Sequence, residues 1–309
     1  MTKKISRRDF IKIQAQGGLC LAGAATGLFL PETGFASQEP DIGVAKGNAS
    51  VATRAAVDLL GGIKKVVKKG HRVLIKPNMS FTRSPETASN THPDVVKTVA
   101  AMCREAGASK IMILDHTLAP GKLCVNISGI GPACETIDKS MVHTINHSSF
   151  FKQVNISGAR SLAQTDVAKE FLKADVLIAV PVAKSHSATG VSLSMKGMMG
   201  LIYDRGIMHR MDLNETIVDL ATLLKADLTV IDGTRVLSTG GPRGPGRVLK
   251  KDTIIASKDM VAADAFAVAA FEWYGKKFTP DRVKHIRLAH ERGLGRADIE
   301  NLSVKTISI

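Results

Sequence analysis

Short apolar runs rich in valine and isoleucine alternate along the chain with segments that have helical periodicity. The apolar runs predict strands near residues 41–45, 72–76, 110–114, 175–180, 227–231 and 253–257. The helical patterns lie near residues 50–68, 93–106, 162–172, 213–224, 260–273 and 279–292. This alternation is typical of parallel strands joined by crossover helices. The sequence therefore predicts an α/β fold: a mostly parallel, doubly wound sheet in three layers, with helices on both faces.

Residues 182–211 follow neither pattern. The stretch is rich in Gly, Ser, Met, Lys and His, and it predicts a long loop. Loops of this length in a compact domain usually carry function. The chain is long enough for one large domain, and a boundary to a C-terminal lobe near residue 212 is compatible with its length.

Residues 1–36 are typical of a twin-arginine signal peptide. The stretch Ser6-Arg7-Arg8-Asp9-Phe10-Ile11-Lys12 precedes a glycine-rich apolar run at 17–30. This run is too short and too weakly apolar to predict a permanent membrane anchor, because a spanning helix needs about 20 apolar residues. An ordinary amphipathic first helix is the alternative, but it does not account for the paired arginines followed by Phe10 and Lys12.

Small residues at Gly34 and Ala36 predict cleavage before Ser37, which leaves a mature domain of residues 37–309. We expect the twin-arginine translocase to export this domain to the periplasm. That pathway carries folded proteins, so a cofactor acquired in the cytoplasm is compatible with the sequence.

The formal net charge of +14 is compatible with an anionic partner. The basic residues are scattered, and aromatic residues make up only 4% of the chain. These features argue against a nucleic-acid surface, which combines clustered basic residues with aromatic stacking. We expect a small anionic molecule as the partner instead.

Three cysteines follow the predicted signal peptide: Cys103, Cys124 and Cys134. None belongs to a C-x-x-C pair, so we expect no iron–sulfur cluster and no zinc site built from cysteines. The oxidising periplasm would allow a disulfide between Cys124 and Cys134.

Four of the predicted strands end in polar residues. In doubly wound sheets, ligands bind beyond the carboxyl ends of the strands. We therefore hypothesise a site at these ends, in which Lys76, Asn78, Lys184 and Asp232 bind the substrate. The strands run into Lys76-Pro77-Asn78, Asp115-His116-Thr117, Lys184-Ser185-His186 and Asp232-Gly233-Thr234-Arg235.

Each of these residues also has a simpler explanation. Lys76 solvates a strand end, Asp232 lies in a turn with Gly233, and His116 belongs to a capped loop. His92 precedes a proline that fits the first turn of a helix, which favours a capping role. The glycine- and proline-rich stretch 240–246 matches no phosphate-binding motif and favours a surface loop.

A different kind of pattern joins His186, Gly190, Ser192 and Lys196 with His209 further on. Neutral imidazoles ligate transition metals or move protons near pH 7, and a lysine shielded from water forms covalent adducts or binds phosphate. The alternative is a structural loop with surface histidines.

These stretches give the mature chain a resemblance to domain-of-unknown-function family 362. The resemblance implies an α/β fold and no settled reaction, and some relatives carry ferredoxin modules that this chain lacks. It covers roughly residues 70–265 and is carried by Val73-Leu74-Ile75-Lys76-Pro77-Asn78, Thr91-His92-Pro93, Gly107-Ala108-Ser109-Lys110, Val182-Ala183-Lys184-Ser185-His186, Met195-Lys196-Gly197-Met198-Met199-Gly200, His209, Ile231-Asp232-Gly233, Ser257-Lys258-Asp259 and Ala263-Asp264.

The spacing of His186, Gly190, Ser192 and Lys196 also resembles a motif of lactate-racemase-type nickel-pincer enzymes. That resemblance implies that Lys196 anchors the pincer cofactor and that His209 binds nickel or another divalent metal. It further implies that His186 and His116 carry protons while hydride moves between a 2-hydroxy acid and the cofactor. The chain departs from the motif where Leu193 and Ser194 replace two glycines, and its gap from Lys196 to His209 is shorter.

The sequence thus favours an exported enzyme that depends on a metal or cofactor and acts on a small anionic substrate, by redox or racemase-like chemistry. In that hypothesis His116, His186 and Lys196 are catalytic and His209 binds metal. Two alternatives remain: a periplasmic protein that binds the ligand without converting it, and an accessory or structural partner of an exported redox system.

Overall fold

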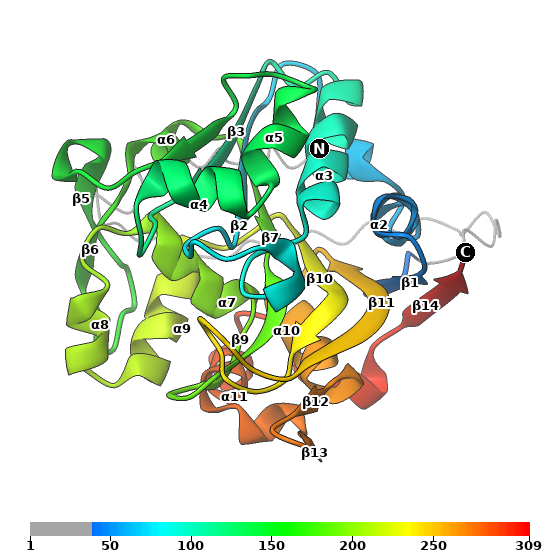
Figure 1. Cartoon of the computed structure of the whole chain (residues 1–309). Coiled ribbons are helices and arrows are strands. Elements are labelled where there is room, and N and C mark those ends of the chain that lie inside the picture. The colour runs from blue at the N-terminus through cyan, green and yellow to red at the C-terminus, as the bar shows by residue number, and fades with distance from the viewer. Residues whose placement is uncertain (1–38) are drawn as a thin grey trace, which may run out of the picture.

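Ten strands in the described part of the chain, residues 39–309, form one large sheet in this computed structural model (Figure 1). The predicted signal peptide lies outside the described residues. The sheet order is β14-β1-β11-β10-β7-β2-β3-β4, and β8 pairs with β10 and β9. The strands are β1 (Ile42–Lys46), β2 (Arg72–Pro77), β3 (Lys110–Asp115), β4 (Val142–Thr144), β7 (Val176–Val180), β8 (Val182–His186), β9 (Gly190–Ser192), β10 (Leu228–Leu237), β11 (Val248–Ser257) and β14 (Val304–Ser308).

Most neighbouring strands of this sheet run parallel. Parallel pairing joins β2 to β3 and β7, β3 to β4, β10 to β7 and β8, and β1 to β14. Antiparallel pairing is confined to β11 with its two neighbours and to the hairpin of β8 and β9. The predicted mostly parallel α/β sheet is confirmed, and all six predicted strands are present in it.

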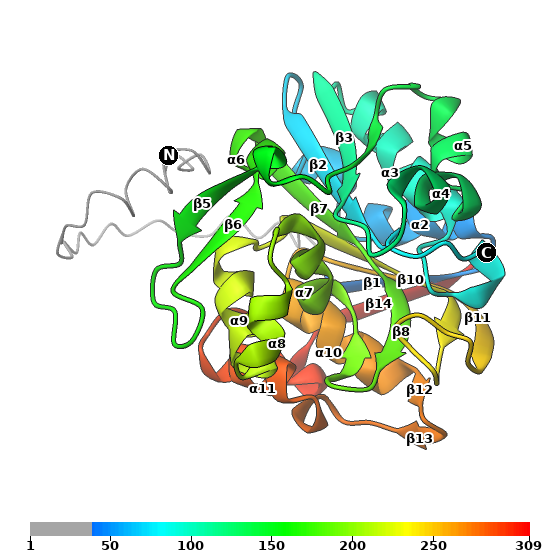
Figure 2. The same cartoon turned by 60° about the vertical axis from the view of Figure 1, so that its left-hand side comes forward.

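Helices cover both faces of the sheet. In β2, Val73 and Ile75 pack into one apolar cluster with α2, α3 and α5, whereas Leu74 between them packs into another with α9, α10 and α11. Such alternation follows from the two-residue period of a strand. Figure 2 shows the two helical layers on opposite sides of the central strands. The helices are α2 (Ala49–Asp58), α3 (Pro93–Glu105), α4 (Gly121–Ile127), α5 (Ile130–Glu135), α6 (Lys169–Lys173), α7 (Ser194–Gly197), α8 (Gly206–Arg210), α9 (Leu213–Leu223), α10 (Met260–Ala270) and α11 (Lys284–Glu291).

Three of the predicted helices were too long. The helix over 279–292 starts as the 3-10 turn η5 (Pro280–Arg282) and is α-helical only from Lys284. The other two were predicted to extend too far at their C-terminal ends. The first, over 50–68, ends at Asp58, because Gly61 and Gly62 take positive φ values of 87° and 82° that break the helical path. The second, over 260–273, ends at Ala270 and passes into β12 (Glu272–Trp273), which pairs with β13 (Lys276–Lys277).

The predicted helix over 162–172 was wrong in type. Its first half is β6 (Gln164–Ala168), which pairs antiparallel with β5 (Phe151–Asn155), and only α6 is helical. Thr165 and Val167 are buried on either side of the more exposed Asp166, as alternate residues of a strand are. The apolar Leu162 and Phe171 flank the strand and extended the helical pattern across it.

The long loop predicted over 182–211 was also wrong. The segment holds β8, β9, α7, the 3-10 turn η4 (Met198–Leu201) and α8. All five residues of β8 are buried although three of them are polar, so its hydrophobic pattern carries no strand signal. These elements line most of the cavity described below.

The cysteines among residues 39–309 are all free and buried, so the disulfide allowed between Cys124 and Cys134 does not form here. The two thiols belong to α4 and α5. In the described residues we find no helix that combines the length and apolar character needed to cross a membrane.

Leu177 tests the packing of the central strand, because its side chain is fully buried beneath the α9 and α10 layer. We expect Leu177→Ala to lower the free energy of unfolding by about 2–5 kcal/mol. Leu123→Ala, at a side chain that is 48% exposed, is the control and should change it by no more than about 0.5 kcal/mol. Urea unfolding followed by circular dichroism measures both, and equal effects would contradict this packing.

Candidate functional site

A cavity of about 380 Å³ lies where β2, β3 and β8 end. It brings together six of the eight predicted site residues, from segments far apart in the sequence. Asp115, Ser80, Ser192 and Arg205 also line it. The six predicted residues are Lys76, Asn78, Lys184, His186, Lys196 and His209.

Lys76 and Asp115 form a buried ion pair at the floor of the cavity. Lys76 Nζ lies 3.0 Å from Asp115 Oδ1, and it also donates to the carbonyl of Pro77 at 2.5 Å. The other carboxylate oxygen accepts from the Met79 amide at 3.0 Å and the Ser80 hydroxyl at 2.8 Å. Burial lowers the pKa of Lys76, whereas Asp115 raises it. The carboxylate is thus fixed in position and keeps Lys76 paired.

Lys184 is buried without a carboxylate partner among residues 39–309. Its Nζ donates to the carbonyl of Ser89 at 2.6 Å and lies 5.2 Å from the ring centroid of Phe81. Burial is the main cause that lowers its pKa to about 7, with Asp115 opposing the shift and Lys196 adding to it. Near neutral pH this lysine is therefore close to its titration midpoint.

Lys196 is only 9% exposed, and its Nζ lies 3.6 Å from the sulfur of Met199. No carboxylate of the described residues forms an ion pair with it. Burial, followed by repulsion from Arg205, lowers its pKa to about 8. Burial also lowers the pKa of the Arg205 guanidinium, which donates to the Thr117 carbonyl at 3.5 Å.

Two histidines line the cavity beside these cations. Burial, and then repulsion from Lys196, lowers the pKa of His186 to about 3, so its ring is neutral at pH 7. Its Nδ1 accepts from the Ala188 amide at 3.2 Å, which leaves the proton on Nε2. Burial followed by Lys196 also lowers the pKa of His209.

His116 lies outside the cavity lining. Its Nδ1–H donates to the carbonyl of Ile202 at 2.9 Å, and its ring stacks on Tyr203 with centroids 6.0 Å apart. The adjacent Asp115 lines the cavity instead. Successive residues at a strand end point in opposite directions, and here the acid faces the site.

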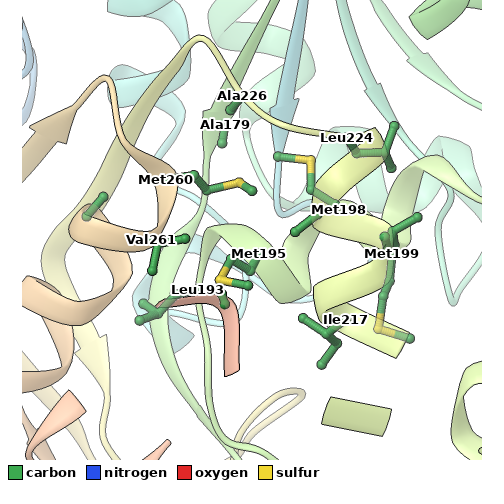
Figure 3. Close-up of a cluster of buried hydrophobic side chains, with 14 of the residues drawn as sticks. Ala179, Leu193, Met195, Met198, Met199, Ile217, Leu224, Ala226, Met260 and Val261 are labelled. Atoms are coloured by element: carbon green, nitrogen blue, oxygen red, sulfur yellow. The ribbon is translucent and has the colours of Figure 1, made fainter. Parts of the chain in front are cut away.

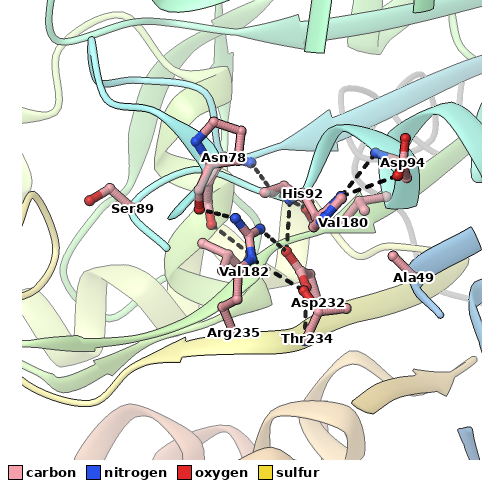
Figure 4. Close-up of polar contacts among 12 residues, drawn as sticks. Ala49, Asn78, Ser89, His92, Asp94, Val180, Val182, Asp232, Thr234 and Arg235 are labelled. Carbon is pink, nitrogen blue, oxygen red and sulfur yellow. Dashed lines mark hydrogen bonds and ion pairs between the residues drawn. The ribbon is translucent and has the colours of Figure 1, made fainter. Parts of the chain in front are cut away.

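Asp232 also lies outside this cavity, and its carboxylate is occupied by local contacts (Figure 4). It accepts from the His92 amide at 2.7 Å and, through its other oxygen, from the Thr234 hydroxyl at 2.6 Å. Arg235 lies 3.3 Å from it. His92 caps α3, as its place before Pro93 predicted, by accepting from the Asp94 amide. Asp232 thus ties the start of α3 to β10.

The turn that carries Lys196 is held by a buried acid that the strand-end argument missed. Asp264, on α10, accepts from the Ser194 and Met195 amides at 2.9 Å each and from the Ser194 hydroxyl at 2.5 Å. Burial raises its pKa to about 6. A lone acid within the apolar run of α10 was the signal that could have found it.

Apolar packing also fixes the turn that carries Lys196. Met195, Met198 and Met199 point into a buried cluster with side chains of α9 and α10 (Figure 3). Methionine side chains adapt to irregular spaces of this kind. The backbone around Lys196 is therefore anchored on both sides, while Lys196 itself faces the cavity.

The cavity does not fit a divalent metal held by protein ligands alone. Residues 39–309 contain no group of three or more His, Cys, Asp or Glu side chains placed to hold a metal ion. His186 and His209 share the cavity with Lys184, Lys196 and Arg205, whose charge repels a cation.

Comparison with known proteins gives a family match, a similar protein sequence and a partly similar solved structure. The family described as "Domain of unknown function (DUF362)" matches residues 73–269. The chain is 26% identical over 232 residues to "Thylakoid-associated protein sll1697" of Synechocystis sp., covering 71% of this chain and 68% of that protein. The lactate racemase apoprotein from Thermoanaerobacterium thermosaccharolyticum superposes with a TM-score of 0.44 and 11% identity. That superposition covers 75% of this chain and 57% of the racemase chain.

Gly200 tests the buried ion pair, because a Cβ atom there would overlap Asp115 Oδ1 and crowd the end of Lys76. We expect Gly200→Ala to lower the free energy of unfolding by about 1–3 kcal/mol through overpacking. Gly197→Ala is the matched control, since its Cβ would meet nothing closer than Asn78 Nδ2 at 3.9 Å. Chemical denaturation compares the two, and a Gly200→Ala protein as stable as the control would contradict the described pair.

Proposed function

We propose that this chain, which belongs to the DUF362 family, is an enzyme that binds a small anionic substrate in the cavity and moves protons to and from it. One observation carries the proposal. Three cationic side chains, Lys184, Lys196 and Arg205, line one cavity without a carboxylate partner among the described residues.

The charge balance of the cavity favours an anion. Its single carboxylate, Asp115, is paired with Lys76. A buried charge without a partner costs several kcal/mol, and a bound anion offsets that cost. The volume of about 380 Å³ suits a small molecule. A carboxylate or phosphate group placed among Lys184, Lys196 and Arg205 would complete the site.

Two groups in the cavity are suited to proton chemistry. The lowered pKa of Lys196, about 8, leaves a neutral amine fraction near physiological pH that can act as a base. His186 is neutral and carries its proton on Nε2, so it can donate a hydrogen bond to a substrate oxygen. Both groups line the cavity that the substrate would occupy.

Anion affinity tests the proposal. We expect Lys184→Gln and Arg205→Gln each to weaken binding of L-lactate or inorganic phosphate by about 10- to 100-fold, because each removes a charged hydrogen-bond donor. Affinity should also fall as pH rises through about 7 and 8, since Lys184 and Lys196 lose their protons in that range. Isothermal titration calorimetry measures both effects.

Lys139→Gln is the control, because this lysine is exposed and its loss leaves the cavity unchanged. Neutral lactamide should not bind. Equal affinity for lactamide and lactate, or no loss in either variant, would overturn the proposal. Binding without conversion, followed for lactate by chiral chromatography, would favour a ligand-binding or accessory role instead.

We propose further that the protein is exported folded to the periplasm by the twin-arginine pathway, on the basis of Arg7, Arg8 and the residues around them. Replacing both with lysine should abolish most export while the precursor accumulates in the cytoplasm. Cell fractionation and immunoblotting measure this. The paired change of Lys3 and Lys4 to arginine, which keeps the charge, is the control. Equal export of the two variants would contradict the proposal.

A further inference from the structure

The three lysines of the cavity differ in what holds their amines. Lys76 is paired with Asp115 at 3.0 Å. Lys184 donates to the carbonyl of Ser89 at 2.6 Å. Lys196 has only the weak contact with the Met199 sulfur, at 3.6 Å, among the described residues. Its amine is therefore the one that is both buried in the cavity and free of a strong acceptor.

Such an environment favours the neutral form of an amine. Burial penalises the ammonium ion, and the neighbouring Arg205 repels it. A lysine placed in an apolar pocket or beside another cation is activated in this way as a nucleophile. The surrounding methionines and the Asp264 contacts fix the turn that carries Lys196, so the backbone that positions the amine is rigid.

We propose that Lys196 forms an imine with the carbonyl carbon of a 2-oxo acid bound in the cavity. This rests on the proposed function, because Lys184 and Arg205 must hold the carboxylate of that acid. A 2-oxo acid combines the two features that the site recognises: an anionic group for the cations and an adjacent electrophilic carbon for the amine.

The step balances without an oxidant or a metal. The Nζ lone pair attacks the carbonyl carbon, a C–N bond forms, and the carbonyl π electrons move to the oxygen, which takes one proton from the amine. The nitrogen then forms the C=N double bond as the oxygen departs with the second amine proton as water. His186, with its proton on Nε2, can donate a hydrogen bond to the departing oxygen. A proton taken up from water converts the imine to the iminium ion, which makes the neighbouring C–H bonds of the substrate more acidic.

Reductive trapping tests this. The full chain is incubated with pyruvate or glyoxylate in the presence of sodium cyanoborohydride, and intact mass spectrometry with peptide mapping locates the adduct. We expect one reduced adduct, on Lys196. Lys196→Arg keeps the positive charge but removes the nucleophile, so it should lose the adduct completely. Lys139→Arg, on the surface, should be labelled as the unchanged protein is.

The outcomes separate this inference from the proposed function. Calorimetric binding of pyruvate without any trapped adduct would overturn the imine but would agree with the proposed anion site. Adducts spread over several lysines, or retained in Lys196→Arg, would also overturn it. Neither binding nor trapping with both acids would overturn the imine together with the proposed function. Circular dichroism of the variant confirms that its fold is retained.

Discussion

Three lysines and an arginine share one cavity with a single carboxylate, and such an arrangement persists only if each charge is paired, solvated or neutralised. The burial of each lysine is compensated in a different way. Asp115 pairs with Lys76, a carbonyl and an aromatic ring hold Lys184, and Lys196 shifts toward its neutral form. Asp115 can serve only one of them, because the Met79 amide and the Ser80 hydroxyl fix its orientation. The remaining positive charge is what gives the cavity its preference for anions.

A site of this kind needs a rigid frame, since mobile side chains would move the charges into water. The parallel strands β2 and β3 supply one wall, because Lys76 and Asp115 at their carboxyl ends form an ion pair at 3.0 Å. The other wall is the short α7, which is too short to be stable on its own. Asp264 satisfies its first amides and the methionine cluster covers its apolar face. Contacts from α10, far along the chain, therefore set the position of Lys196.

The sheet and most of the cavity lining could be predicted from the sequence, because buried parallel strands have a strong apolar signal and their ends gather polar residues. Two predicted strand-end residues could not be placed correctly: His116 follows the end of β3, whereas Asp232 lies within β10, which continues to Leu237. Local contacts keep both side chains out of the cavity. Nor could the pattern reveal β8, whose buried residues include Lys184 and His186. Arg205 was missed because its role depends on tertiary contacts that no local motif encodes, and the contacts of Asp264 with α7 are likewise visible only in the fold, although its place in an apolar helix marks it as unusual.

Anion binding and an amine nucleophile place opposing demands on Lys196. An anion seated against Arg205 weakens the repulsion that favours the neutral amine, and so draws a proton back onto it. Burial is the larger of the two causes, however, and it remains when ligand replaces water in the cavity. If Lys184 and Arg205 hold the carboxylate, their positive charges offset most of its negative charge. The field that the anion exerts on the Lys196 amine is then weak. Because Lys184 and Arg205 bind the anion and Lys196 supplies the amine, one cavity could both attract an anion and keep a reactive amine beside it.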